Sequence, residues 1–296
     1  MSASIILQLI LSGVTIGSIY AMVALGFNII YNSTSIINFA QGEFVMLGGM
    51  FMVSLVGPLN LPMWVAFPIA VLAVTLIGTA FERLCIHPLK MPSVLSLIII
   101  TIAGSILLKG GAMFAWGKET FSLPHFSTEK PILLLEATIL PQTVWILGII
   151  GMVVLLLALF FRFTIVGKAM RACAANRPAA SLVGINVKRI VLLSFALSAA
   201  IGAIAGIIIT PISLMDYERG AILGLKGFGA AVLGGLGNPM GAVVAGFLIG
   251  IVESLCAGLI SSHYKDAVGL VVLLMVLFIK PSGLFGSAQV SKLKKF

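Results

Sequence analysis

Residues 240–262 read MGAVVAGFLIGIVESLCAGLISS, and Glu253 is the only charged residue among them. A stretch of about 20 mostly apolar residues is long enough to cross a lipid bilayer as an α-helix. Nine such stretches are present, at 5–30, 37–57, 63–81, 93–116, 142–161, 190–212, 222–237, 240–262 and 264–280. Because 222–237 is short enough to be a broken or re-entrant element, the sequence predicts an all-α, polytopic membrane protein with eight or nine transmembrane helices.

The composition excludes most other classes of protein. Hydrophobic residues make up 60% of the 296 residues and charged residues 9%, and the mean hydropathy is +1.20. Soluble domains contain roughly 25% charged residues, so a soluble enzyme, a disordered protein and a nucleic-acid-binding protein are all excluded. The three cysteines and three histidines are isolated from one another, which predicts neither disulfides nor a metal site. We expect residues 1–296 to form a single membrane-embedded domain, with the first span retained.

Positive charge is distributed unevenly between the loops. The stretch 162–189 contains six Lys or Arg residues and no acidic residue, and basic residues also exceed acidic ones in 82–92 and in the tail from Lys280 onward. Cytoplasmic loops of membrane proteins carry such an excess of Lys and Arg. The remaining loops mix both signs, and they are 117–141, 213–226 and 263–266. The pattern predicts a cytoplasmic C-terminus and, with nine spans, an N-terminus outside.

A weak internal repeat is present in the apolar segments. A Leu-Gly-Gly triplet followed by a Gly and a Glu occurs twice, as Leu47–Gly49, Gly78 and Glu82, and as Leu233–Gly235, Gly250 and Glu253. If the two sets are related, the first four spans match the last four and run in the opposite direction. Inverted repeats are typical of transporters, in which the pathway follows the repeat interface. Chance similarity in apolar sequence is the alternative explanation.

Four polar residues within the predicted spans stand out. Asn38, Gln41 and Glu43 are close together near the start of the second span, and Glu253 is alone in the eighth. A carboxylate at membrane depth costs a few kcal/mol and usually marks a polar partner or a water-filled path. Either these residues form structural hydrogen bonds between helices, or they line a pathway or a gate at a helix break near Gly42.

Glycine spacing in the eighth span indicates a helix contact. Gly246 and Gly250 stand four residues apart, a spacing that allows two helix backbones to approach closely. Glu253 follows Gly250 by three residues and so lies on the same helical face. We expect this face to be buried against another helix, with a hydrogen-bond partner for Glu253 nearby.

Cations are expected only near the membrane surfaces. We assign Lys226 to the loop 213–226, and Lys109 is close enough to the end of its span for its ammonium group to reach the surface. With no Lys or Arg in mid-span to bind a carboxylate, the sequence predicts a largely apolar path with low intrinsic affinity for its solute.

The basic loop 162–189 has the features of two short helices. Residues 167–175 are strong helix formers after an initial Gly. Asn176 can cap a second helix, Pro178 suits its first turn, and Gly184 is placed to end it. Such an Ala-rich pair suits docking into another protein, whereas a solvated or lipid-bound loop is the alternative.

Sequence signatures of catalysis are missing. The chain contains no phosphate-binding loop, no nucleophile elbow, no zinc-protease helix and no dinucleotide fingerprint. We therefore expect neither enzymatic activity nor a cofactor in this chain. If transport is driven by ATP, another chain must hydrolyse it.

Four motifs, which follow one another in the family's order along the chain, together resemble the bacterial branched-chain amino-acid ABC permeases of the LivH type. They are NFAQGE at 38–43, the loop from Gly167 to Gly184, GFGAAVLGGLGNPMGA at 227–242 and PSGLFG at 281–286. The similarity extends over essentially the whole chain. Because that family includes relatives for ribose, urea and short amides, the resemblance fixes the architecture better than the solute.

The resemblance implies an importer in the bacterial inner membrane with several partners. These are a paralogous permease subunit, two cytoplasmic ATPase subunits that hold ATP and Mg, and a periplasmic or lipid-anchored binding protein. The ATPase-contacting loop of the family falls on Gly167, Ala169, Arg171, Ala172, Ala179 and Gly184. Family members usually have acidic residues between the two short helices, but residues 175–178 contain none, so packing and Arg171 are the expected contacts.

The leading hypothesis is the permease subunit of an ATP-driven importer of leucine, isoleucine and valine. One alternative is an importer of urea, short amides or another small solute. A rival from a different class is a stand-alone, proton-coupled secondary transporter with Glu43 and Glu253 as proton carriers. An intramembrane enzyme has no support, because no nucleophile–base or metal constellation is visible.

Overall fold

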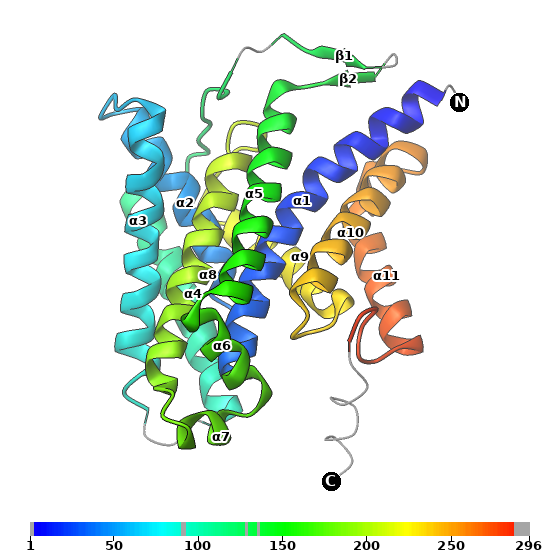
Figure 1. Ribbon diagram of the computed structural model, residues 1–296. Helices are drawn as coiled ribbons and strands as arrows, with labels where there is room; N and C mark the ends of the chain where they lie inside the picture. Colours follow the sequence, from blue (N-terminus) through cyan, green and yellow to red (C-terminus); the bar gives the residue numbers. More distant parts are fainter. Residues whose placement is uncertain (1–2, 90–92, 128–129, 135–136, 287–296) are drawn as a thin grey trace.

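The computed structural model describes residues 3–89, 93–127, 130–134 and 137–286, and it is a bundle of helices (Figure 1). The first half contains α1 Ala3–Thr34, α2 Gln41–Val56, α3 Met63–Phe81 with a π-helical turn Glu82–Ile86, α4 Val94–Trp116 and α5 Pro141–Phe163. The second half contains α6 Ile165–Ala175, α7 Arg177–Leu182, α8 Val187–Ile209, α9 Arg219–Gly234, α10 Pro239–Leu259, a 3₁₀ turn Ser262–Tyr264 and α11 Lys265–Ile279.

Side-chain caps explain where many of these helices begin. An oxygen of the residue before the first turn accepts a hydrogen bond from a backbone N–H inside that turn, which satisfies a group that the helix itself leaves unpaired. The capping residues are Ser93 for α4, Thr164 for α6, Asn176 for α7, Asn186 for α8 and Asn238 for α10.

All nine predicted apolar segments form helices. Seven helical segments in the described part of the chain are long and apolar enough to cross a membrane, which confirms the all-α polytopic class. The other two, α2 and α9, have 16 residues each. The prediction of a full span at 37–57 is wrong at its start, because residues 35–40 are not helical and Ser35 has a φ of 57°.

The helices alternate in direction along the bundle. α1 starts at the end that bears the hairpin of β1 Ile132–Leu134 and β2 Ala137–Ile139, and it runs toward the end that bears α6 and α7 (Figure 1). α11 ends on the same side as α6 and α7. The start of α1 and the end of α11 therefore lie at opposite ends of the bundle, as an odd number of crossings requires. The hairpin lies in what the sequence predicts only as a loop, 117–141.

The core is built around α1 and α8. Within the protein, 67% of the apolar segment of each of these two helices is buried, compared with 6% for the segment that contains α11. Phe44 of α2 and Phe195 of α8 are among the largest fully buried side chains. The outer helices α3, α4, α5 and α11 expose apolar faces, as expected of helices that contact lipid.

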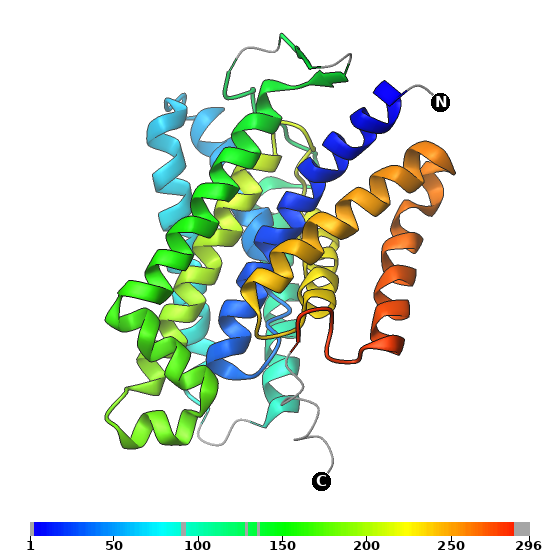
Figure 2. The same ribbon diagram turned by 45° about the vertical axis from the view of Figure 1, so that its right-hand side comes forward.

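Helix packing follows a two-fold inverted repeat. α1 packs along α10 as α8 packs along α3, and α1 crosses α9 as α8 crosses α2 (Figures 1 and 2). The pairs α1–α8 and α2–α9 each join equivalent helices. α1 runs toward α6 and α7 while α8 runs away from them, so the repeat is inverted. The predicted correspondence of the first four and last four spans is thus present. The two Leu-Gly-Gly triplets do not occupy equivalent positions, because Leu47–Gly49 lies inside α2 whereas Leu233–Gly235 lies at the end of α9.

Candidate functional site

Charged side chains within or at the starts of the apolar helices gather on one side of the protein. α3 contains no charged residue between Met63 and Phe81, and α5 has only Arg162 in its last turn. We name the side formed by α4, α9 and α11 the charged face. The charged residues on it or directly behind it are Glu43, Lys109, Glu218, Lys226, Glu253 and Asp266. Ionisable groups at membrane depth almost always face protein or water rather than lipid.

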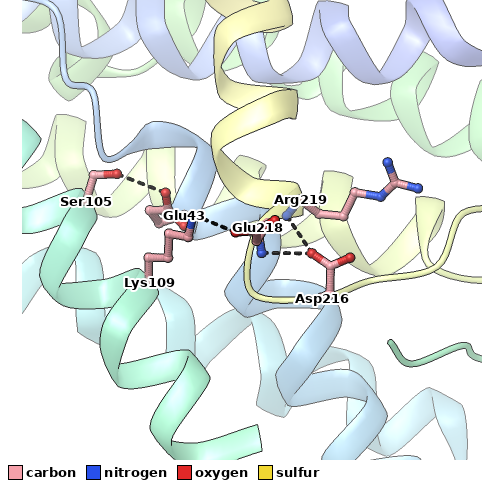
Figure 3. A network of polar contacts seen from close by, with 6 residues as sticks. All are labelled: Glu43, Ser105, Lys109, Asp216, Glu218 and Arg219. Carbon is pink, nitrogen blue, oxygen red and sulfur yellow. Dashed lines mark hydrogen bonds and ion pairs between the residues drawn. The ribbon is translucent and has the colours of Figure 1, made fainter. Parts of the chain in front are cut away.

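The first polar cluster of this face is centred on Glu43 (Figure 3). Its Oε1 atom accepts a hydrogen bond of 2.9 Å from Ser105 Oγ on α4, and the residue is 1% exposed. The other carboxylate oxygen, Oε2, is buried beside Gly220 and has no hydrogen-bond partner among the described residues. Lys109 Nζ lies 3.4 Å from Glu218 Oε1, and both of these side chains are partly exposed. Polar contacts therefore link α4 both to α2 and to the start of α9.

Asp216 fixes the start of α9 in the same cluster. Its Oδ1 atom accepts hydrogen bonds from the backbone N–H groups of Glu218, at 2.8 Å, and Arg219, at 2.9 Å (Figure 3). α9 consequently begins at Arg219, three residues before the predicted start of the span. This shift places Lys226 in the middle of the helix.

The second polar cluster surrounds Glu253 of α10. This residue is 0% exposed, accepts a hydrogen bond of 2.9 Å from the Tyr20 hydroxyl of α1, and forms an ion pair with Lys226 of α9. Lys226 Nζ also lies 2.9 Å from Asp266 Oδ1 in the first turn of α11. The predicted burial of Glu253 beside a hydrogen-bond partner is confirmed.

The prediction that no cation lies in mid-span is wrong. The Lys226 side chain is 12% exposed and stands between two carboxylates within the bundle. The sequence contained a signal for this position, because Asp216 and Glu218 mark a helix N-terminus just before Arg219. The glycine-rich, weakly apolar first half of α9 concealed it.

Asn38 and Gln41 do not line the charged face. Both are fully buried. Gln41 Nε2 donates to the backbone oxygen of Ser198 at 3.2 Å, and Ser198 Oγ is 2.5 Å from Gln41 Oε1. Asn38 Oδ1 accepts from the Ala40 N–H at 3.1 Å, which shapes the turn before α2. Gln41 therefore ties α2 to α8, and Glu43 is the member of this trio that reaches α4.

The short helices α2 and α9 touch at their N-termini. Gly42 and Gly220 are the second residues of their helices, and a side chain on Gly42 would overlap the backbone of Gly220 and of Gly224. Because Gly42 and Gly220 occupy equivalent positions of the two repeats, the pseudo-two-fold axis passes close to this contact. The chain is not helical between Thr34 and Gln41, so the helix break that the alternative of a gate near Gly42 requires lies just before Gln41.

The glycine face of α10 lies against α1. An added Cβ on Gly246 would overlap the backbone of Ala21, and one on Gly250 would overlap that of Gly17. These contacts bring the two backbones together without intervening side chains. They hold α1 and α10 at the close spacing that lets Tyr20 reach Glu253.

Two hollows flank α9 on the charged face. One, of about 310 Å³, lies between α9 and α4 and is lined by Phe27, Phe39, Phe228 and Ser105 together with aliphatic side chains. The other, of about 240 Å³, lies between α9, α10 and α11 beside the second polar cluster. Leu225 borders both. Within the residues that the structure describes, no group of three or more His, Cys, Asp or Glu side chains is placed to hold a metal ion.

A helical hairpin, α6–α7, occupies the end of the bundle opposite the β-hairpin (Figure 1). Thr164 accepts a hydrogen bond from the Gly167 N–H at 2.9 Å, and Asn176 accepts one from the Ala179 N–H at 3.0 Å. Gly184 has a φ of 89°, which favours glycine, and follows the end of α7. The predicted pair of short helices is confirmed, although α6 begins at Ile165.

The six predicted contact residues of the hairpin differ in exposure. Gly167 is buried against α5, and Ala169 and Ala172 are half-buried against the core. The exposed ones are Arg171, Ala179 and Gly184. Sequence reasoning missed the large apolar side chains that α6 and α7 present outward, which are Ile165, 85% exposed, Leu182, 89% exposed, and Val183, 77% exposed.

Arg177 joins the hairpin to the rest of the bundle. Its Nη1 atom donates to the backbone oxygen of Thr34, the last residue of α1, at 3.1 Å. Burial lowers the pKa of the Arg177 guanidinium and raises the pKa of the nearby Cys173 thiol. The hairpin is therefore anchored to the helix that runs through the centre of the protein.

Known proteins with similar sequences complete the description of the site. The chain matches the family "Branched-chain amino acid transport system / permease component" over residues 9–278. It is 32% identical, over 97% of both chains, to the high-affinity branched-chain amino acid transport system permease protein LivH of Salmonella typhimurium, and 31% identical, again over 97% of both, to BraD of Pseudomonas aeruginosa. It is 28% identical to the ribose import permease protein RbsC of Haemophilus influenzae, over 88% of this chain and 81% of that protein. The chain belongs to the branched-chain amino acid transport system permease family.

Proposed function

We propose that this chain is the membrane-spanning subunit of an ATP-driven importer of branched-chain amino acids. The observation that carries the proposal is the family membership over residues 9–278, with relatives of matching length that are named for this transport. The charged face supports it. Partly exposed ions such as Lys109 and Glu218 would be several kcal/mol less stable against lipid than against water or protein.

The partners of the chain are assigned to three surfaces. A second, paralogous permease subunit covers the charged face, so that the two subunits enclose the pathway between them. Two ATPase subunits, which hold ATP and Mg, bind at the α6–α7 hairpin and the equivalent hairpin of the second permease. A periplasmic or lipid-anchored binding protein delivers the solute at the opposite end, near the β-hairpin. In this arrangement the hairpin 162–189 and the C-terminus are cytoplasmic and the protein lies in the bacterial inner membrane.

The inverted repeat suggests how access alternates. The short helices α2 and α9 meet where Gly42 contacts Gly220, and neither residue has a side chain that would resist sliding. A movement at the ATPase end would therefore shift α2 and α9 past each other at this contact, opening the charged face first to one side and then to the other.

Reconstitution of the chain with its partners tests the proposal. Proteoliposomes that contain both permeases and the ATPases, with ATP inside and the binding protein outside, should take up leucine, and the chain alone should transport nothing. An excess of isoleucine or valine should compete, whereas urea and short amides should not.

Uptake by the isolated chain under a proton gradient would overturn the proposal in favour of a stand-alone secondary transporter. In the structure the Glu253 carboxylate is already engaged by Lys226 and by the Tyr20 hydroxyl.

A further inference from the structure

We propose that the hollow between α9, α10 and α11 is a transit site for a zwitterionic amino acid with a branched aliphatic side chain. The inference rests on the proposed function and deepens it, because it places a solute-binding site within this chain. Both a paired charge set and an apolar chamber are needed for such a ligand, and this hollow combines them.

The polar end of the hollow contains an ion pair that a ligand can exchange. Glu253 is fully buried and held by Tyr20 and Lys226, so it is the fixed partner of the lysine. Asp266 is the second partner, at 2.9 Å, and its side chain is 77% exposed at the start of α11. The contact between Lys226 and Asp266 is therefore the one that can open at small cost.

A zwitterion can form an ion pair with each of the two residues, Lys226 and Asp266, once the contact between them has opened. Its carboxylate would accept hydrogen bonds from Lys226 Nζ, and its ammonium group would donate to the Asp266 carboxylate. The total charge of the site is the same before and after binding, so no unpaired charge is created in a region of low dielectric constant. A simple anion on Lys226 would leave Asp266 without a partner, and a simple cation on Asp266 would gain no contact with Lys226, which keeps only Glu253. A zwitterion is therefore the ligand that gives both residues of the opened contact a new partner.

The apolar end of the hollow suits an aliphatic side chain. Its walls are formed by Ile222, Leu225, Ile249, Leu270 and Leu273. Such contacts contribute about 0.8 kcal/mol for each buried methylene group, which is modest enough for the solute to leave again. Leu225 also borders the neighbouring hollow against α4, so release in that direction leads along the charged face.

Asp266 lines the hollow toward the end of the bundle where solute would arrive. Asp266 is in the first turn of α11, which begins at the end opposite the α6–α7 hairpin (Figure 1). A solute delivered at that end meets Asp266 before it meets Lys226.

Gly229 sets the width of the chamber. An added Cβ at this position would meet only Leu273 Cδ2, at 3.7 Å, which is ordinary van der Waals contact. The Cβ atom of an alanine or valine at 229 therefore fits beside α11, and the two additional methyl groups of valine reduce the space available to the solute further. Gly269, on the facing helix, is unsuitable for this purpose because a side chain there would overlap Glu253.

The test measures selectivity as well as affinity in the complete transporter. Gly229→Val should weaken leucine uptake at least tenfold relative to alanine uptake, because a smaller solute still fits. Asp266→Asn should weaken the binding of leucine to the full-length permease, measured by equilibrium dialysis, about tenfold, and should leave the Lys226–Glu253 pair intact. Gly151→Ala is the matched control, since this exposed glycine of α5 has no atoms within 4 Å of an added Cβ.

Two outcomes separate the inference from the function on which it rests. If the wild-type complex transports leucine and Gly229→Val and Asp266→Asn leave both selectivity and affinity unchanged, the transit site is refuted and the proposed function stands. If the wild-type complex transports no branched-chain amino acid with every partner present, the proposed function fails and this inference fails with it. A uniform loss of uptake for all solutes, with an unchanged leucine-to-alanine ratio, would also refute the site.

Discussion

At the scale of single residues, the unusual feature is a buried pair of charges, Glu253 and Lys226, with a third, exposed charge at Asp266. Glu253 and Lys226 are both largely removed from solvent, and each costs several kcal/mol to bury alone. Tyr20 and Asp266 supply further contacts, so neither charge is left with a single partner. Removing either Glu253 or Lys226 alone should therefore lower the free energy of unfolding more than removing both together.

Substitutions of Glu253 test this coupling. Glu253→Gln keeps an acceptor for Tyr20 and should lower the free energy of unfolding by about 1 kcal/mol. Glu253→Leu leaves Lys226 with only its exposed partner and should cost about 3 kcal/mol. The double variant Glu253→Leu/Lys226→Met should recover part of that loss, as thermal unfolding of the detergent-solubilised protein would show. Complete loss of transport in both single variants, with normal unfolding temperatures, would instead indicate proton carriage.

At the scale of elements, α2 and α9 depend on a contact between two glycine-bearing helix ends. A methyl group at Gly42 has no space, because the backbone of α9 occupies it. Gly42→Ala should therefore destabilise the protein by about 1–3 kcal/mol and slow transport. Gly148→Ala, on α5 and without neighbours within 4 Å of the added Cβ, is the control that should behave like wild type. Wild-type stability of Gly42→Ala would show that α2 and α9 are not held together here.

The α6–α7 hairpin gives a second prediction at this scale. Leu182 is exposed and apolar outside the spans, so Leu182→Asp should change the stability of the chain by less than about 0.5 kcal/mol. If Leu182 is buried by the ATPase, the same change should weaken ATPase binding at least tenfold, which co-purification from detergent would reveal. Leu59→Asp, in the turn before α3, is the control and should retain the ATPase. A bulky residue at Ala172 would instead disturb the chain's own core, since that side chain packs inward.

At the scale of the whole molecule, the sequence predicted the features that the thickness of the bilayer determines, which are the number and the placement of the apolar helices. The length of a crossing fixes the size of an apolar run, so nine helices could be placed to within a few residues. It did not predict which helices are central, because the lipid-exposed α5 is even more apolar than the central helices α1 and α8, so apolarity alone does not identify the centre of the bundle. Lys226 was misplaced for a related reason, since its charge is compensated by Glu253 and Asp266 from distant parts of the sequence.

Orientation is the remaining whole-molecule property, and it can be tested directly. The six cations of 162–189 predict that the α6–α7 hairpin is cytoplasmic, and the odd number of crossings then puts Glu119, after α4, on the outside. In a variant without the native cysteines, Ala179→Cys should react with a membrane-impermeant maleimide only in inside-out vesicles, and Glu119→Cys only in intact cells. Both positions are exposed in the chain, so when it is expressed without the ATPase subunits a failure to react would reflect the membrane and not the fold. Labelling of both from the same side would require an even number of helices between them and would refute the crossing of α5. Reversed labelling of the pair would keep the fold but turn the chain over in the membrane. The α6–α7 hairpin, with the ATPase surface, would then lie outside, and the solute would pass the charged face and its transit site in the opposite direction.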